Sequence, residues 1–241
     1  MSRPYFRIYG DYREPAPVFY ARAECPWLDQ VERHWTTIRD EYAAHVARHR
    51  LRESFVPDDV EIHGWRSVNF VTYRHWYRHN CAHFPRTVAL LRAIPHLTSA
   101  FINLLEPQAR LPPHNGDTNA TYRCHLGLVV PGDADACGLE VGGQRRGWRE
   151  GEAFAFNEAY RHRVWNDTDR DRVVMVFDVL RPEFRDRSLA ICGDVLGAMT
   201  LTMLETRLPP LRRLPATARR GLHRLLGLGA RAALVLGDGA R

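Results

Sequence analysis

A run of short strands from Phe101 to Phe184 constrains the fold of this chain more than any other feature. The run reads, in order, "FINLL", "YRCHLGLVV", "GLEVGG", "EAFAFN", "HRVWN" and "RVVMVFDVL". Turn residues separate these segments at a spacing of roughly 8 to 12 residues, which is typical of a β-sandwich or barrel. The sequence therefore predicts a mainly β fold for this part of the chain.

Helical patterns flank the strands. Residues 27–49 carry apolar side chains three and four apart, which predicts an amphipathic helix packed on the core. Further on, "HGWRSVNFVTY" alternates like a strand, and "PRTVALLRAI" predicts a short helix beginning at Pro85. We expect a single domain over residues 1–205, with a β core over about residues 60–185.

The C-terminal residues 206–241 form a tail of different composition. "RLPPLRRLP" predicts a proline-broken linker, and residues 218–236 predict a basic, weakly amphipathic helix interrupted by Gly221, Gly227 and Gly229. Residues 207–241 hold eight arginines and one aspartate, which is +7, so the rest of the chain carries −1 of the net +6. This distribution excludes a basic nucleic-acid-binding domain. The tail could contact acidic lipid or protein, or form a frayed extension.

Cysteine usage and the N-terminus bear on location. The cysteines are five in number and scattered, with no C-x-x-C pair, so they indicate neither a disulfide framework nor a zinc knuckle. The first residues lack an apolar signal segment, and no uninterrupted apolar stretch reaches the ~20 residues that span a bilayer. We expect a cytoplasmic protein that could associate peripherally with membranes through its tail.

The period of two along the strands predicts which side chains share a face. In "YRCHLGLVV" it groups Arg123, His125, Gly127 and Val129, and it places Tyr122, Cys124, Leu126, Leu128 and Val130 on the opposite face. Two later strands group His162 with Val164, and Arg172 with Val174, Val176 and Asp178. Three strands thus offer a histidine or an arginine to one inner surface of a small barrel.

His114 and His162 are candidates for a metal site, because imidazole is the commonest protein metal ligand and strands fix its direction. A facial triad for non-haem Fe(II) would place a carboxylate two residues after the first histidine, where this chain has Gly116. The chain has twelve histidines, so two of them can show this spacing by chance. The alternative for each is an ordinary surface or core histidine.

Several segments around these residues resemble the aspartyl/asparaginyl β-hydroxylase family of Fe(II)/2-oxoglutarate-dependent oxygenases. The segments are "GWRSVNF", "NCAHFPRTVALL", "PHNGDTN", "YRCHLGLVVP", "GWREGEAFAFNEAYRHRVWN" and "RDRVVMVFDVLRPEF". The resemblance covers about residues 20–185. It implies a double-stranded β-helix, the cupin-like jelly roll, with N-terminal helices packed on it and a helical tail.

The resemblance also implies roles for individual residues. His114 and His162 would bind Fe(II), in a family whose vertebrate enzyme also has glycine at the position of Gly116. The 2-oxoglutarate contacts would be Trp65, Arg123, His125 and Arg172. Arg172 would hold the distal carboxylate in bidentate fashion, which suits a rigid guanidinium, and it joins the two histidines as a catalytic residue.

Two departures from the family pattern affect the site. Asn103 stands where the family often has serine, and it can still hydrogen-bond a carboxylate of 2-oxoglutarate. Asp117 stands where the family often has proline. Its carboxylate could orient the iron-bound water, bind a cationic group of the substrate, or form an Asx turn.

The implied reaction is hydroxylation of an unactivated carbon by O2 and 2-oxoglutarate, with release of succinate and CO2. An Asp- or Asn-like amino acid, a peptide or a related small molecule is the expected substrate. One alternative is a halogenase, with chloride beside Gly116. Others are a lipid acyl hydroxylase and a cupin-like metal-binding module without turnover.

Two further patterns have a functional and an ordinary interpretation. His75, His79 and His83 are spaced four residues apart and could line a helix face as a second metal site, although helix surface and packing is the favoured interpretation. The acidic segment "NDTDRD" lacks the glycine and glutamate of a calcium loop, and it predicts a solvated turn.

Overall fold

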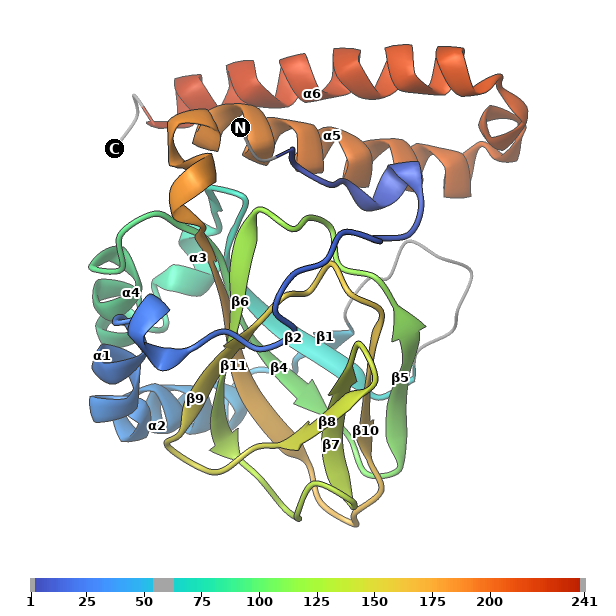
Figure 1. Ribbon diagram of the computed structural model, residues 1–241. Helices are drawn as coiled ribbons and strands as arrows, with labels where there is room; N and C mark the ends of the chain where they lie inside the picture. Colours follow the sequence, from blue (N-terminus) through green and yellow to red (C-terminus); the bar gives the residue numbers. More distant parts are fainter. Residues whose placement is uncertain (1–2, 54–62, 239–241) are drawn as a thin grey trace.

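Two antiparallel sheets form the body of the molecule (Figure 1). The computed structural model describes residues 3–53 and 63–238. The larger sheet has the strand order β1-β2-β4-β11-β6-β9, with β3 paired to β2, and the smaller has the order β5-β10-β7-β8. This is the jelly-roll arrangement that the sequence predicted. The strands of the larger sheet are β1 (Arg52–Glu53), β2 (Trp65–Thr72), β3 (His75–Trp76), β4 (Leu97–Leu105), β6 (Thr121–Val129), β9 (Ala153–Phe156) and β11 (Arg172–Leu180), and those of the smaller are β5 (Ala109–His114), β7 (Cys137–Val141), β8 (Gln144–Gly147) and β10 (His162–Asn166).

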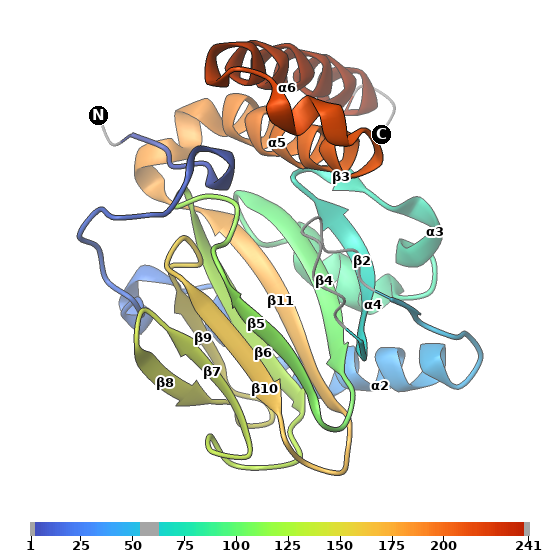
Figure 2. The same ribbon diagram turned by 90° about the vertical axis from the view of Figure 1, so that its right-hand side faces the viewer.

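The N-terminal helices cover the outer face of the larger sheet (Figures 1 and 2). They are α1 (Leu28–Arg33), α2 (Trp35–Val46) and α4 (Pro85–Arg92), with the single turn α3 (Arg78–Cys81) before α4. The helix predicted over residues 27–49 is therefore two helices, because the backbone of His34 (φ −114°, ψ 15°) leaves the helical region. The start of α4 at Pro85 is confirmed. The buried Glu41 of α2 accepts hydrogen bonds from the backbone N–H groups of Arg86 and Thr87, at 3.0 and 2.8 Å, and so caps α4.

The inner face of the larger sheet carries the polar residues that the alternation of β6 predicted. Arg123 pairs with Asp178, His125 with Val176 and Gly127 with Val174 across the β6–β11 ladder. The alternation fails at the end of β6, because the register shifts between Val173 and Val174 of β11. Val129 consequently packs with the outer, helix-covered cluster and Val130 with the inner one, which reverses the prediction for these two residues.

The C-terminal residues form a pair of antiparallel helices above one end of the barrel (Figure 2). They are α5 (Ser188–Arg207) and α6 (Ala216–Asp238), joined through a 3-10 turn at Pro209–Arg213. Glu205 of α5 holds Arg219 of α6 in two hydrogen bonds of 2.7 and 3.0 Å. The predicted interruption at the glycines is wrong for residues 216–238, since α6 is continuous. Gly227 lies where the helices cross, and a Cβ on Gly197 would come within 2.6 Å of its backbone nitrogen. Glycine therefore serves close packing here.

A segment from the N-terminus fastens the helical pair to the barrel. Phe6 bridges to Thr118 and joins a buried cluster with Leu180, Ile191 and Leu234. Nearby, the Tyr9 hydroxyl and His223 Nδ1 lie 2.5 Å apart. The segment Pro182–Arg207 is long and apolar enough to cross a membrane by length and composition alone, with 39% of its apolar window buried. The buried part of this segment packs against α6 and the barrel.

Candidate functional site

His114 and His162 lie side by side where β5 pairs with β10. They are direct partners in the ladder between these strands, and their ring centroids are 4.2 Å apart. His162 Nδ1 lies 2.9 Å from the carbonyl oxygen of Tyr160, and His114 Nδ1 lies 2.8 Å from that of Pro112. A carbonyl oxygen only accepts, so each Nδ1 carries the hydrogen and donates it. In the neutral ring, each Nε2 then presents a lone pair, which is the arrangement of metal-binding histidines.

The surroundings keep both imidazoles in the neutral form that binds metals. Burial lowers the pKa of His114, and burial together with the adjacent His114 lowers the pKa of His162 well below the ordinary value. The sequence predicted that these two residues meet, and the structure brings them together.

Glu158, which the sequence analysis missed, occupies the place of a side chain at residue 116. A Cβ on Gly116 would lie 2.4 Å from Glu158 Oε2, so glycine is required there. The Gly116 N–H donates to the Glu158 carbonyl at 2.7 Å, which fixes the two backbones against each other. Glu158 is fully buried, and burial raises the pKa of its carboxyl group. A carboxyl group therefore stands beside Gly116 although residue 116 supplies none.

Asp117 lies at the rim of the same site. Its Oδ2 accepts a hydrogen bond of 3.1 Å from the Tyr73 hydroxyl, and its Oδ1 is 3.6 Å from Arg7 Nε. The Asp117 side chain thus contacts a tyrosine and an arginine of its own chain. The role of Asp117 beside a metal-bound water stays a prediction.

Arg123 is held by two buried carboxyl groups. Its Nε and one terminal nitrogen donate to the two oxygens of Asp178, at 2.9 and 2.8 Å, and its other terminal nitrogen is 2.5 Å from Glu158 Oε2. Asp178 and Glu158 both have no exposed surface. Every nitrogen of the guanidinium group is therefore engaged within the protein, and a contact of Arg123 with 2-oxoglutarate stays a prediction.

Arg172 is buried without such partners. The residue is 3% exposed, its Nε has no hydrogen-bond partner in the described part of the chain, and burial lowers its pKa to about 10. Its guanidinium lies over the ring of Trp148, with Cζ 4.8 Å from the ring centroid. An isolated buried charge is costly unless an opposite charge meets it. The position of Arg172 therefore suits an anionic ligand.

Two more buried polar atoms without partners lie on the same sheet face as Arg172. Trp65 and Arg172 both pair with Leu105, in β2 and β11 on either side of β4, and Asn103 is two residues before Leu105. Trp65 Nε1 and Asn103 Oδ1 have no hydrogen-bond partner among the described residues. Three of the residues expected to contact 2-oxoglutarate thus present unsatisfied polar atoms to one interior.

His125 completes this interior together with Trp148, which the sequence analysis missed. Trp148 Nε1 donates to His125 Nδ1 at 3.2 Å, and the two rings are stacked at 5.9 Å. Because an indole N–H only donates, Nδ1 of His125 accepts and its Nε2 carries the hydrogen. Burial, Arg123 and Arg172 all lower the pKa of His125, which keeps it neutral. His125 is therefore a fixed hydrogen-bond donor. An isolated tryptophan in a loop gives no sequence signal for this role.

A cavity of about 370 Å³ opens beside His114. Its floor includes Pro113, His114, Asn115 and Asp117. Its other walls come from the N-terminal segment and from the helical pair, through the residues Tyr5, Arg7, Ile8, Gly10, Asp11, Ala198, Met199, Thr202, Glu205 and Arg219. The site is therefore reached between the barrel and α5.

The two secondary patterns have different outcomes. His75, His79 and His83 do not line one helix face, because α3 is a single turn and His75 lies in β3. His83 instead lies beside His45 and His49. In "NDTDRD" the turn is organised by the buried Asn166, whose amide nitrogen donates to the carbonyl oxygens of Leu105, Glu106 and Arg170.

Comparisons with known proteins agree with this geometry. The family model described as aspartyl/asparaginyl beta-hydroxylase matches residues 32–182. An ornithine lipid ester-linked acyl 2-hydroxylase from Rhizobium tropici is 33% identical over 176 residues, which is 69% of this chain and 61% of that protein. The human aspartyl/asparaginyl beta-hydroxylase is 29% identical over 164 residues, 65% of this chain and 21% of that protein. The chain thus spans less than two thirds of the length of either relative.

Among solved structures, an oxidoreductase of the 2OG-Fe(II) oxygenase family from Burkholderia pseudomallei resembles 69% of this chain and 96% of its own, with 13% identity and a TM-score of 0.45. The fold and the paired imidazoles define a cupin-like barrel with a site suited to one metal ion. The family match covers more than half of the chain and includes both histidines. The chain belongs to the aspartyl/asparaginyl β-hydroxylase family.

The residues present fit the Fe(II) and 2-oxoglutarate that this family implies. Two neutral imidazoles with free Nε2 lone pairs suit Fe(II). The buried guanidinium of Arg172, whose Nε has no hydrogen-bond partner among the described residues, suits a carboxylate, and Trp65 and Asn103 offer further polar atoms around it. The donors and the charge are those that a dicarboxylic keto acid requires.

Proposed function

We propose that this protein is an Fe(II)- and 2-oxoglutarate-dependent hydroxylase that acts on carbon 2 of a lipid-bound acyl chain. The observation that carries the hydroxylase assignment is the pair His114 and His162, each with Nδ1 beside a carbonyl oxygen, which assigns the lone pair to Nε2. When bound, iron and 2-oxoglutarate supply the activation of O2 that inserts one oxygen atom into a C–H bond, with release of succinate and CO2.

The residues of this chain bind and orient the reactants. His114 and His162 hold the metal, and Arg172 binds the distal carboxylate of 2-oxoglutarate. Trp65, Asn103 and the Nε2–H of His125 supply hydrogen bonds around it. Arg123 holds the buried carboxyl groups of Asp178 and Glu158 in place on the same sheet face as Arg172. Asp117 at the rim accepts hydrogen bonds from solvent near the metal.

The cavity supports a substrate with an acyl chain and a polar head. Ile8, Ala198 and Met199 supply apolar wall, whereas Arg7 and Arg219 supply positive charge and Asp11 and Glu205 negative charge. A wall of both signs suits a zwitterionic head group, and the rhizobial relative named as an ornithine lipid acyl 2-hydroxylase has 33% identity. An Asp- or Asn-like side chain, the substrate in the name of the human relative, is the second candidate, which the charged wall residues would accommodate.

The outer face of α6 supports contact with a lipid surface. Leu225, Leu228, Ala232, Val235 and Leu236 are exposed and lie one, two or three turns apart on one side of the helix. The exposed Arg220 and Arg224 flank this side. An amphipathic helix with arginines beside an apolar stripe binds anionic lipid, with about 1 kcal/mol for each arginine. We propose that a cytoplasmic protein docks on an anionic membrane through α6.

Turnover with two substrate sets tests the function. The protein is loaded anaerobically with Fe(II) and 2-oxoglutarate, then given O2 with vesicles of ester-linked acyl lipids or with peptides containing Asp and Asn. We expect succinate formation with the vesicles, and a hydroxy group at carbon 2 of the released fatty acid by mass spectrometry. The control is His114→Ala, which should form no succinate.

The other outcomes each select another function. Hydroxylated peptide without hydroxylated lipid would assign the Asp/Asn-type reaction. A chlorinated product in chloride buffer would indicate a halogenase, and failure to bind Fe(II) and 2-oxoglutarate would indicate a cupin-like module without turnover. Co-sedimentation with anionic vesicles tests the docking: Leu225→Glu/Leu228→Glu should abolish it, whereas Met203→Glu on α5 should not.

A further inference from the structure

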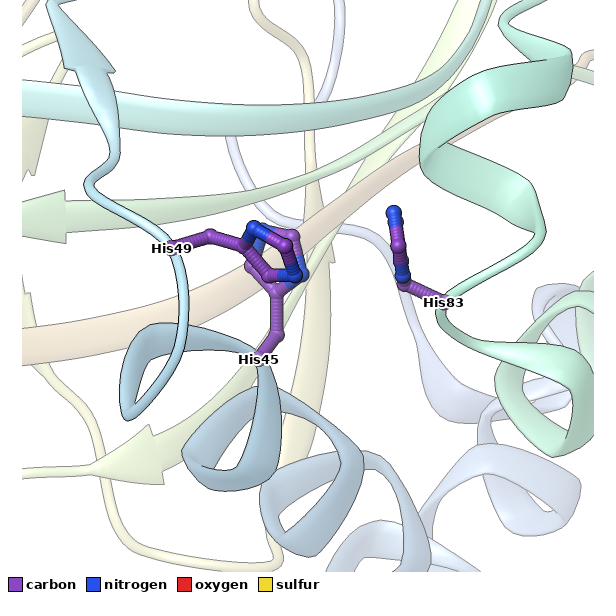
Figure 3. A group of neighbouring side chains, drawn as sticks. All are labelled: His45, His49 and His83. Atoms are coloured by element: carbon purple, nitrogen blue, oxygen red, sulfur yellow. The ribbon is translucent and has the colours of Figure 1, made fainter.

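Three histidines from the end of α2 and from the chain before α4 lie close together. His45 lies in the last turn of α2, His49 lies three residues after that helix, and His83 lies between α3 and α4. Each offers one nitrogen, and these nitrogens all lie within 4.8 Å of one another. Figure 3 shows the rings of His45 and His49 together, with the His83 ring facing them from the chain before α4. The end of α2 and the start of α4 thus share an imidazole cluster.

The ring positions are close to those that one metal ion requires. Ring centroids are separated by 4.7 Å for His45 and His49, 4.8 Å for His49 and His83, and 5.3 Å for His45 and His83. Nitrogens on a tetrahedral zinc ion at about 2.1 Å lie roughly 3.4 Å apart. Side-chain rotations that move the ring nitrogens by about one ångström would bring them to this spacing. His49 and His83 are exposed, so their rings have room to make these rotations.

His45 gives the cluster a fixed, buried member. Its Nδ1 is buried and has no hydrogen-bond partner in the described ranges, although buried polar atoms are normally paired. The ring is packed on Phe84, with centroids 5.0 Å apart.

The composition of the cluster selects the metal. It contains three imidazoles and neither a thiolate nor a carboxylate, a set that suits Zn(II) and its neighbours in the transition series. We propose that His45, His49 and His83 form a zinc site, with water as the fourth ligand, that fastens the end of α2 to the chain entering α4. The capping contact of Glu41 with the N-terminus of α4 lies at the same junction. The site is independent of His114 and His162, which lie in the smaller sheet.

Zinc titration of the full chain tests the proposal. We expect the parent to bind two equivalents of Zn(II), and His114→Ala/His162→Ala to bind one. His49→Ala and His83→Ala should each weaken that remaining site at least tenfold. Co(II) in place of zinc should give the visible absorption of a tetrahedral ion, which His49→Ala should remove. His75→Ala is the matched control and should leave binding unchanged, because its ring contacts Tyr77 outside the cluster.

Thermal unfolding gives a second measurement, which also shows whether each variant is folded. Zinc should raise the melting temperature of His114→Ala/His162→Ala, and should not raise it when His49→Ala is added. Without zinc, the His49→Ala protein should melt with its parent, since His49 is exposed. The proposal is overturned if the double variant binds no zinc, or if His49→Ala and His83→Ala bind it as their parent does.

Discussion

Arg123 and Arg172 lie on neighbouring strands of one sheet and face the same interior, yet their surroundings are opposite. Arg123 has two buried carboxyl groups around its guanidinium, whereas Arg172 has an indole ring and an Nε without a partner in residues 3–53 and 63–238. A buried charge is tolerated in a folded protein when an oppositely charged group lies beside it. The difference therefore indicates that the charge of Arg123 is balanced within the folded protein, and that the charge of Arg172 is balanced by a bound anion.

The largest expected effect in this comparison is on stability. Arg123→Met leaves Asp178 and Glu158 buried beside an apolar side chain, so the free energy of unfolding should fall by about 3–5 kcal/mol. Urea unfolding of the metal-free protein measures it. A loss below about 1 kcal/mol would mean that the two carboxyl groups find other partners, and the contrast between the arginines would then be lost.

Arg172→Met should have the reverse profile. Removing an unpaired buried charge should leave the free energy of unfolding unchanged or raise it. The affinity for 2-oxoglutarate should fall about 100-fold, which is about 3 kcal/mol, because the distal carboxylate loses its charged partner. Anaerobic titration measures the affinity. Arg172→Lys, which keeps the charge without the planar fork, should lie between the two. Normal affinity in Arg172→Met would assign the carboxylate to another residue.

Arg123 and Arg172 both lower the pKa of the His125 imidazole, so the pH dependence of stability reports on both arginines. The folded pKa of His125 is depressed below its unfolded value of about 6.5, so its contribution to stability is complete above that pH and is lost as pH falls. Each buried histidine of this kind removes up to about 1.4 kcal/mol per pH unit. In metal-free protein, His125→Phe should reduce the slope of the unfolding free energy against pH by the equivalent of up to one proton. An unchanged slope between pH 6.5 and 5, roughly the window of loss, would show that His125 takes up its proton equally in the folded and unfolded states, so that its pKa is not depressed.

Trp148→Phe should have the smallest effect. It keeps an aromatic ring beneath Arg172 but removes the hydrogen bond to His125 Nδ1, which costs about 1 kcal/mol. His125 then loses its fixed tautomer. The affinity for 2-oxoglutarate should therefore fall about fivefold, which corresponds to about 1 kcal/mol. The same anaerobic titration measures it. A change as large as that of Arg172→Met would place Trp148 itself in contact with the co-substrate.

Local sequence patterns predicted the parts of the site that strands impose. The period of two along β6 placed Arg123 and His125 on one face, because alternation needs no knowledge of the partner strand. The same rule failed at Val129 and Val130, where a register shift opposite Val173 depends on the neighbouring strand. Which strand edges meet is likewise a property of the whole barrel.

Contacts between distant segments had no local signal. Glu158 fills the place beside Gly116 through a turn that comes forty-two positions later in the chain, and Trp148 reaches His125 from a loop. The glycines of α6 indicated a broken helix when considered alone, and they are explained by the crossing with Gly197 on α5. The cluster of His45 and His49 with His83 depends in the same way on how α2 packs against the start of α4.

The cavity beside His114 is lined partly by residues inside the family match and partly by residues outside it. The family match ends at residue 182 and begins at residue 32, so both histidines and the barrel interior lie within it. Ile8, Asp11, Met199 and Arg219, which wall the cavity, lie outside it. Substitutions at these four wall residues would therefore change the cavity and leave His114, His162 and Arg172 in place. The surface that an incoming molecule meets beside His114 is thus set in part by the two ends of the chain, far in sequence from the barrel strands.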